Sequence, residues 1–521
     1  MNPLLQDNQS MTIHRLKSVL SALAALTLWA PSVSAEVRLH ALFTDHMVLQ
    51  RGQVVPFWGW ADEGETVNVT FRGQIATTVA KNGKWIVYFP QQKAGGPEVL
   101  RVQGKNQIEV KDILVGEVWI CSGQSNMEWP LRASFDSQGA IAASANPNLR
   151  LFSVPKLKAD APVENVNARW EESAPETVPG FSAVAYFFGR DLQKALGVPV
   201  GLIHTSWGGS PAEVWMSEAA LAANPNHKRD ILESYAGKVA QNKTAIAQWD
   251  KENAELKAAG KPLNKNKPGL GWKPTELYNG MIAPLLPYGI AGAIWYQGES
   301  NAVRAWQYRD LFAEMILNWR QDFYQPELPF LAVQLAPWDK NRKRSITEIA
   351  ASPVDSDWAE LREAQDYSAK VLKNVGIAVI TDVGDKDDIH PTKKEPVGAR
   401  LALAAQKIAY KKNLVWTGPT YDKVQFKNGK GVVSFKNIGS GLETRMGQVA
   451  GFSIAGADQK FHWAKAEIDG RKVVVSSAAV PQPVAVRFGW ADYPVVDLWN
   501  QEGLPASPFR TDDFILTTKP K

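Results

Sequence analysis

The spacing of apolar residues divides the chain into three parts. In residues 36–110 apolar and polar side chains alternate, a pattern typical of strands that place one face on a core. Residues 413–521 return to the same pattern. Asn-Gly pairs at 82–83 and 428–429 predict tight turns within these parts. We therefore expect β-rich, sandwich-like regions at both ends of the chain.

Residues 111–412 instead alternate short apolar runs with longer segments that have helical spacing. This alternation predicts an α/β domain with a mainly parallel sheet between two helical layers. The expected strands are residues 113–121, 200–204, 292–296, 330–334 and 377–382, and the expected helices are residues 185–196, 306–319, 358–369 and 397–410.

Residues 230–272 interrupt this domain with a charged helical stretch and a following loop. Its lysines are mixed with acidic residues, among them Asp250, Glu252 and Glu255. Mixed charge favours a solvated insertion over a recognition patch.

The first 35 residues have the pattern of an export signal. A basic start that includes Arg15 and Lys17 precedes the apolar residues 19–29, and small residues allow cleavage after Ala35. An uncleaved anchor is the alternative, but the apolar run is short for a bilayer. We expect a periplasmic or secreted protein whose mature form has no membrane attachment.

Composition narrows the class of protein further. A net charge of +5 on 521 residues, without a long basic run, argues against nucleic-acid binding. Cys121 is the only cysteine, so no disulfide forms within the chain. Because Cys121 lies inside an apolar run, we interpret it as a small buried side chain rather than a nucleophile.

Ser125 follows the first expected strand of the middle domain, in the sequence Gly-Gln-Ser-Asn. Open α/β sheets bind ligands at the carboxyl ends of their strands, where this serine is expected. A serine that only caps the next helix is the structural alternative. The Gly-x-Ser-x-Gly elbow is absent because residue 127 is Met.

Three further segments supply groups that acyl transfer needs. Gly208 and Gly209 offer N–H groups in a turn after a strand, residues 297–301 supply an amide side chain after another strand, and His390 follows nearby carboxylates. A serine nucleophile requires a neutral histidine, a carboxylate that orients it, and donors for the oxyanion. His390 is the best base among seven histidines, while His204, at a strand end, is interpreted as a core residue.

These segments resemble the sialate O-acetylesterase family of SGNH-type hydrolases, carbohydrate esterases that remove acetyl groups from sugars. The resemblance extends over almost the whole expected mature chain. The similar blocks, in the family's order, are residues 45–50, 123–129, 205–209, 295–301, 361–365, 388–391 and 503–512.

The resemblance implies roles for individual residues. Ser125 corresponds to the nucleophile and His390 to the general base. The oxyanion donors would be the Ser125 N–H, one glycine of the pair Gly208 and Gly209, and the Asn301 amide.

The acid that supports the base has two candidates. The Asp-x-x-His spacing of SGNH hydrolases points to Asp387, whereas the Asp-Ile-His-Pro block of this family emphasises Asp388. Neighbouring residues seldom point the same way, so only one orients the imidazole. We favour Asp388 and keep Asp387 as the alternative.

Several residues are expected to bind substrate or support the site. Glu299 either supports the Asn301 loop or is a buried structural acid. Arg362 either lines the pocket or pairs with an acid on its own helix. The tryptophans in or beside the blocks either stack on sugar rings or belong to the core: Trp129, Trp207, Trp215 and Trp295.

The sequence thus predicts a serine esterase that removes O-acetyl groups from carbohydrates through an acetyl-enzyme, without a cofactor or metal. The acidic cluster at 382–388 suggests calcium only if further oxygen ligands join it. The alternatives are an esterase for acetylated plant polysaccharide (xylan or xyloglucan) and a non-catalytic carbohydrate-binding protein. The expected partner is an acetylated sugar, with neither nucleic acid nor membrane, and the oligomeric state is open.

Overall fold

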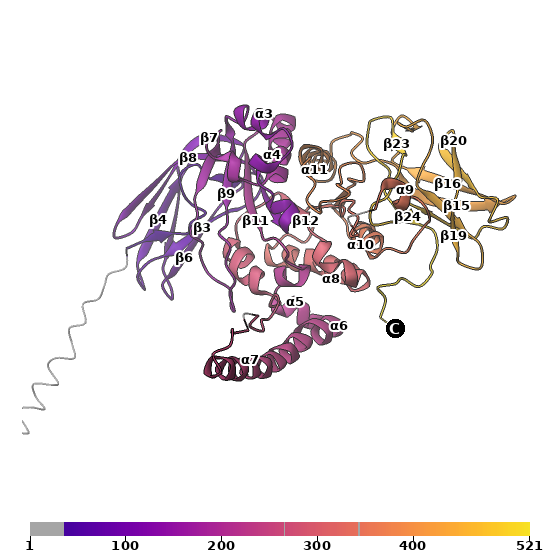
Figure 1. Cartoon of the computed structure of the whole chain (residues 1–521). Helices are drawn as coiled ribbons and strands as arrows, with labels where there is room; N and C mark the ends of the chain where they lie inside the picture. Colours follow the sequence, from indigo (N-terminus) through magenta and orange to yellow (C-terminus); the bar gives the residue numbers. More distant parts are fainter. Residues whose placement is uncertain (1–35, 265, 342–343, 521) are drawn as a thin grey trace, which may run out of the picture.

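The computed structural model describes residues 36–264, 266–341 and 344–520. The expected export signal lies outside the described residues. Figure 1 shows an indigo β region at one end, a middle region in which helices cover a sheet, and a yellow β region at the other end. The α/β architecture expected from the sequence is therefore confirmed.

A mainly parallel sheet forms the centre of the molecule. All its neighbouring strands are parallel except the antiparallel edge pair of β9 and β10. The five expected strands are present, although β14 begins two residues earlier than expected and ends at Ala378. The strands, in spatial order, are β10 (Trp170–Ser173), β9 (Asn146–Ser153), β11 (Val200–Ser206), β8 (Gln107–Gly123), β12 (Gly292–Tyr296), β13 (Phe330–Val333) and β14 (Val375–Ala378).

Alternate side chains of the central strands serve two separate cores. Trp119 and Cys121 of β8 pack with α4 (Ala183–Leu196) and α11 (Glu395–Ile408). Val118 and Ile120 belong to the core that includes α8 (Ala305–Asp322) and α10 (Asp357–Val371). Because successive strand residues point to opposite faces, one apolar run buries both layers.

Strand β8 also joins the N-terminal β region to the central sheet. Its first part pairs with β7 (Gly95–Gln103) and β2 (Val48–Gln50), and its last part pairs with β11 and β12. The domain boundary expected near residue 110 falls within this continuous strand. The other N-terminal strands are β1 (Arg38–Leu39), β3 (Val55–Trp60), β4 (Thr66–Phe71), β5 (Gln74–Val79) and β6 (Lys84–Phe89).

Both Asn-Gly pairs form turns with left-handed backbone. The φ angles are 54° and 72° at Asn82 and Gly83, and 50° and 72° at Asn428 and Gly429. These values are typical of two-residue hairpin turns.

Two β-sheets of four strands and one of two form the C-terminal region around a core of its own. The first consists of β15 (Thr420–Lys427), β16 (Lys430–Lys436), β21 (Lys472–Ser476) and β20 (Lys465–Asp469). The second consists of β19 (Phe461–Trp463), β18 (Phe452–Ala455), β22 (Ala485–Phe488) and β24 (Phe509–Arg510), and β17 (Leu442–Glu443) pairs with β23 (Trp499–Asn500).

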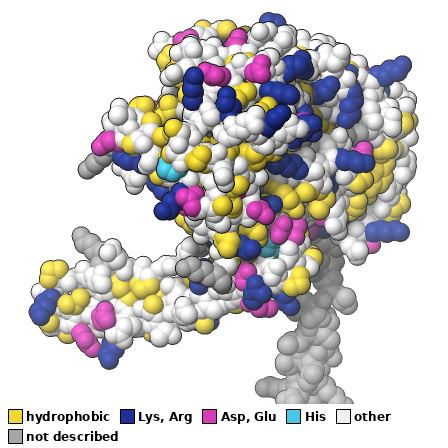
Figure 2. Space-filling model, turned by 90° about the vertical axis from the view of Figure 1, so that its right-hand side faces the viewer, with side chains coloured by type: hydrophobic (Ala, Val, Ile, Leu, Met, Phe, Trp, Pro, Cys, Tyr) yellow, Lys and Arg dark blue, Asp and Glu magenta, His cyan; other side chains and the backbone are white. Residues whose placement is uncertain are grey.

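The expected charged helix is present as η4 (Lys228–Glu233) and α7 (Ser234–Ala258). Helix α7 is exposed over most of its length and stands out from the body as an arm (Figures 1 and 2). In the part of the chain that the structure describes, no helix has the length and apolar character needed to cross a bilayer.

Short helices and turns make up most of the loops over the sheet. They are α2 (Ser125–Glu128), η1 (Leu131–Ala133), α3 (Ser137–Ala142), η2 (Val178–Gly180), η3 (Ala212–Trp215), α5 (Glu218–Ala223), α6 (Pro225–His227), η5 (Tyr278–Ile282), η6 (Ala283–Leu285), η7 (Glu299–Arg304) and α9 (Ile346–Ile349).

Candidate active site

Ser125 begins helix α2 directly after the carboxyl end of β8. The turn requires Gly123, whose φ is +141° and where a Cβ would lie 2.2 Å from the Tyr296 carbonyl oxygen. The Gln124 N–H donates to that same carbonyl at 3.0 Å. The first residue of α2 is thereby fixed at the sheet edge with a partly exposed side chain.

His390 lies in the loop between β14 and α11 and reaches the serine. Its Nε2 is 2.8 Å from the Ser125 Oγ. The Asn126 amide donates to the Ile389 carbonyl at 3.0 Å, which holds the histidine loop against the start of α2. Trp129 stacks on the imidazole, with ring centroids 5.3 Å apart and planes inclined by 18°.

Of the two candidate acids, Asp388 is the one that contacts the imidazole. Its Oδ1 lies 3.5 Å from the His390 Nδ1 and accepts the His390 N–H at 2.9 Å. Asp387 pairs with Lys386 instead, and its side chain is 62% exposed. The loop is shaped by Asp385, whose carboxylate accepts the N–H groups of both aspartates.

Burial lowers the pKa of His390 below its usual value. Asp388 opposes this effect, and the positive charge of Lys394 adds to it. The imidazole is therefore neutral at pH 7, which is the form that accepts a proton from serine.

Gly208 lies directly against the serine. A Cβ at Gly208 would be 3.2 Å from the Ser125 Cβ, so the absence of a side chain allows this approach. Its N–H donates to the Glu128 carboxylate at 2.6 Å, and Lys156 donates to the same carboxylate at 2.6 Å. The Gly208 donor thus already faces an anion beside Ser125, whereas Gly209 is exposed with φ of +74°.

The Asn301 side chain bonds to neighbouring protein groups in this structure. The side chain is fully buried, its amide donates to Glu213 at 3.0 Å, and its oxygen accepts the Ala212 N–H at 2.9 Å and the Gln297 amide at 2.7 Å. A side chain committed in this way fixes the loop after β11 to the loop after β12. These bonds make Asn301 a positioning residue in this structure, and its contact with the oxyanion stays a prediction.

Glu299 contacts the residue next to the nucleophile rather than the Asn301 side chain. Its Oε1 accepts from the Asn126 amide at 2.6 Å, while its buried Oε2 has no hydrogen-bond partner in the described structure. Burial raises the pKa of this carboxyl group.

Lys394 is a site residue that the sequence reasoning missed. It is 1% exposed, and its ammonium donates to the Asn126 oxygen. Burial lowers its pKa to about 7. Nothing in the sequence distinguishes it from the exposed Lys393, because only the fold brings the residue before α11 to Asn126.

Arg362 and two of the tryptophans have structural positions. Arg362 is buried and donates to the carbonyl groups of residues 335, 336, 491 and 492, so it neither lines the pocket nor pairs with an acid of its helix. Trp215 and Trp295 are fully buried in the core. Trp129 and Trp207 keep partly exposed rings at the site.

Alternative nucleophiles and bases fit less well. Burial raises the pKa of the Cys121 thiol, which disfavours the reactive thiolate. The His204 Nε2 lies 2.6 Å from the Ser206 Oγ, and burial lowers the pKa of His204 to about 4. This agrees with the interpretation of His204 as a core residue.

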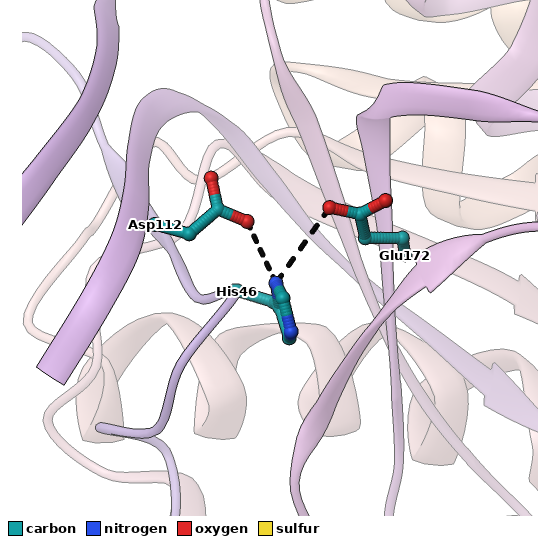
Figure 3. Close-up of side chains that lie close together, drawn as sticks. All are labelled: His46, Asp112 and Glu172. Atoms are coloured by element: carbon teal, nitrogen blue, oxygen red, sulfur yellow. Dashed lines mark hydrogen bonds and ion pairs between the residues drawn. The ribbon is translucent and has the colours of Figure 1, made fainter.

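Acidic groups that suggested metal binding have other partners. Asp382 forms a two-armed ion pair with Arg400. Figure 3 shows a separate group, in which the His46 Nδ1 lies 2.6 Å from Asp112 and 3.7 Å from Glu172. Buried Arg150 also pairs with both carboxylates, so this cluster is an ion-pair network that joins β8, β9 and β10.

The chain is similar to known carbohydrate esterases. A family model for carbohydrate esterases, sialic acid-specific acetylesterase, matches residues 238–407. The sialate O-acetylesterase of Homo sapiens is 29% identical, over 94% of this chain and 96% of its own length. That of Mus musculus is 28% identical, over 91% and 94%.

A solved structure extends the match to the fold. The crystal structure of a carbohydrate acetylesterase from Xanthomonas citri is 41% identical, covers 92% of this chain and 100% of its own, and superposes with a TM-score of 0.78. The chain belongs to the sialate O-acetylesterase family of carbohydrate acetylesterases and is a carboxylic ester hydrolase.

Proposed function

We propose that this protein removes O-acetyl groups from carbohydrates through an acetyl-enzyme intermediate on Ser125. The observation that carries the proposal is the 2.8 Å contact between the Ser125 Oγ and the Nε2 of a neutral His390. Nucleophile and base within hydrogen-bond distance, with a carboxylate on the far side of the base, are the arrangement that serine acyl transfer requires.

In the first half-reaction the Ser125 Oγ attacks the acetyl carbonyl carbon while His390 takes the hydroxyl proton. Asp388 stabilises the imidazolium that forms. The carbonyl oxygen becomes an oxyanion, for which the N–H groups of Ser125 and Gly208 are the proposed donors. The imidazolium then protonates the departing sugar oxygen, the C–O bond breaks, and the acetyl group remains on Ser125.

In the second half-reaction water replaces the sugar. His390 removes a proton from the water as its oxygen attacks the acetyl-enzyme, and the same donors hold the second oxyanion. The imidazolium returns the proton to the Ser125 Oγ, and acetate leaves. No cofactor takes part in this sequence.

The Glu128 carboxylate must move before the Gly208 N–H can donate to the oxyanion that forms from the ester. Its carboxylate accepts the Gly208 N–H in this structure, and Lys156 offers it a second partner. We propose that substrate entry shifts the carboxylate towards Lys156 and frees the donor.

We further propose that the protein is exported and that its substrate is an O-acetylated sugar outside the cytoplasm. The basic and apolar pattern of the first 35 residues supports export. The names of the mammalian relatives favour sialate esters, and the Xanthomonas citri relative is a carbohydrate acetylesterase of unspecified sugar. Xylan and xyloglucan esters are therefore the comparison substrates.

The test measures acetate released from 4-nitrophenyl acetate, O-acetylated sialic acid, acetylated xylan and acetylated xyloglucan oligosaccharides. Ser125→Ala should abolish release from every substrate that the wild type hydrolyses, while Ser477→Ala in the C-terminal region should keep wild-type rates. Mass spectrometry of a quenched reaction should detect one acetyl group on the Ser125 peptide. Activity retained by Ser125→Ala would overturn the mechanism, and a wild type without activity on any acetylated sugar would overturn the function.

A further inference from the structure

A cavity lies between the base of the α7 arm and the start of α8. Its volume is about 820 Å³, towards the upper end of the usual range for ligand pockets. Its walls combine aromatic rings with polar groups: Tyr235, Trp272, Trp306, Asp230, Arg304 and Asp310. Figure 2 shows the arm standing away from the body of the molecule.

Two contacts connect this cavity to the catalytic serine. The ring of Trp272 meets the ring of Trp207 edge-on at 5.5 Å, and Trp207 directly precedes Gly208, which lies against Ser125. On the other side, Glu213 lines the cavity and accepts from the Asn301 amide. The cavity therefore begins where the loops of the candidate active site end.

The cavity wall is held in place before any ligand binds. Arg304 donates to Glu213 at 2.6 Å and to Gln307 at 2.7 Å. Glu314 accepts from Asn224 at 2.6 Å and lies 2.8 Å from the His227 Nδ1. Wall side chains that are already held by hydrogen bonds lose little conformational entropy when a ligand binds. This favours a ligand-binding role for the cavity over an empty space left by imperfect packing.

The C-terminal tail supplies the last part of the wall. The Thr518 hydroxyl accepts the Trp306 N–H at 3.0 Å, and the Thr518 N–H donates to the buried Glu360 carboxylate at 3.0 Å. Figure 1 shows the chain end returning to the neighbourhood of α8 and α10. Residues 518–520, fixed in this way, line the cavity together with the start of α8.

We propose that this cavity binds the sugar units next to the acetylated one, so that the protein acts on oligosaccharides and polysaccharides in preference to free monosaccharides. Aromatic rings cover the apolar faces of sugars, and planar amide, carboxylate and guanidinium groups bond their hydroxyls. Arg304 pairs with Glu213, and Arg229 with Asp230, whereas the lining residues Lys238, Asp310 and Lys519 form no ion pair among the described residues. The wall therefore offers charged groups of both signs as well as aromatic rings. This inference rests on the proposed function, because it concerns the remainder of the same substrate.

The experiment measures kcat/KM for acetylated xylo-oligosaccharides of one to six units, with 4-nitrophenyl acetate as the small substrate. The wild type should gain about ten-fold or more with chain length. Trp272→Ala and Asp310→Ala should each raise KM for the longer oligosaccharides and so remove most of the gain in kcat/KM. Both variants should leave the hydrolysis of 4-nitrophenyl acetate unchanged. Trp463→Ala, an exposed tryptophan of β19, is the matched control and should keep the gain.

Three outcomes would overturn the subsite. They are a wild type without chain-length dependence, both cavity variants retaining it, or both losing activity equally on 4-nitrophenyl acetate. Failure of the proposed function is distinguished from these outcomes, because in that case no acetylated sugar of any length releases acetate. Asp310 is exposed and has no ion pair in the described structure, so its variant tests the cavity even if Trp272→Ala fails to fold.

Discussion

The two neighbouring aspartates before His390 differ in direction, and this difference predicts a difference in catalysis. Asp388 contacts the imidazole, whereas Asp387 turns to Lys386. Asp388→Asn should lower kcat by about 100-fold, because an amide stabilises the imidazolium less than a carboxylate does. Asp387→Asn should stay within about two-fold, because its carboxylate does not touch the base. Steady-state kinetics on 4-nitrophenyl acetate check both values, and a larger loss in Asp387→Asn would reassign the acid.

The charge of Lys394 predicts how activity depends on pH. Protonation of His390 removes the base, so kcat/KM should fall as pH drops through the lowered pKa of His390, below its ordinary value of 6.5. Lys394 is one cause of that lowering. Lys394→Met removes a positive charge, raises the pKa of His390, and should move the acid limb of the pH profile to higher pH.

The control for that profile is Lys393→Met, which alters the exposed neighbour of Lys394. Its acid limb should coincide with the wild-type limb. An unchanged limb in Lys394→Met would show that Lys394 acts on the packing of Asn126 and Glu299 alone, without an electrostatic effect on the base.

At the scale of elements, apolar runs predicted the central strands because parallel strands are buried on both faces and need no alternation. The same signal failed at β14, where Val379 and Ile380 are buried but lie beyond the strand. A run of hydrophobic residues indicates that the segment is buried. It does not indicate whether the segment is hydrogen-bonded to a neighbouring strand. The continuity of β8 across the expected boundary was likewise hidden, because its first part alternates like an ordinary hairpin strand.

Ser125 and His390 could be found from the sequence because each directly follows or lies near a predicted strand, and strand ends share one edge of the sheet. The partners of Asn301 could not be found. They depend on how the loop of residues 207–213 folds over η7, and no local pattern encodes that contact.

The loop contacts of Asn301 carry a prediction at this scale. Asn301→Ala leaves Glu213, Gln297 and the Ala212 N–H without their buried partner, and it should destabilise the protein by about 2–4 kcal/mol. Thermal unfolding should show a lower Tm together with reduced kcat, because the Gly208 loop loses its support. Reduced kcat at an unchanged Tm would instead indicate direct contact of the amide with the oxyanion.

For the whole molecule, Arg362 links the helical layer to the C-terminal region. From α10 its guanidinium donates to two carbonyl groups after β13, at residues 335 and 336, and to two of the C-terminal region, at residues 491 and 492. A second link on the same helix is the ion pair of Glu363 with Arg510, at 2.8 Å. Helix α10 thus lies between the sheet that carries the site and the β region that follows it.

Arg362→Met retains the length of the side chain but removes its donors, so four buried or partly buried carbonyl groups lose a partner. The expected cost is about 3–5 kcal/mol, seen as a lower Tm or as earlier unfolding of the C-terminal region in hydrogen exchange. Because Arg362 does not touch Ser125 or His390, the variant that remains folded at low temperature should keep the wild-type pH profile and KM for 4-nitrophenyl acetate. Lys370→Met, on the last turn of the same helix, is the matched control and should leave the Tm nearly unchanged. A raised KM with an unchanged Tm in Arg362→Met would restore the pocket role that the sequence first suggested for this arginine.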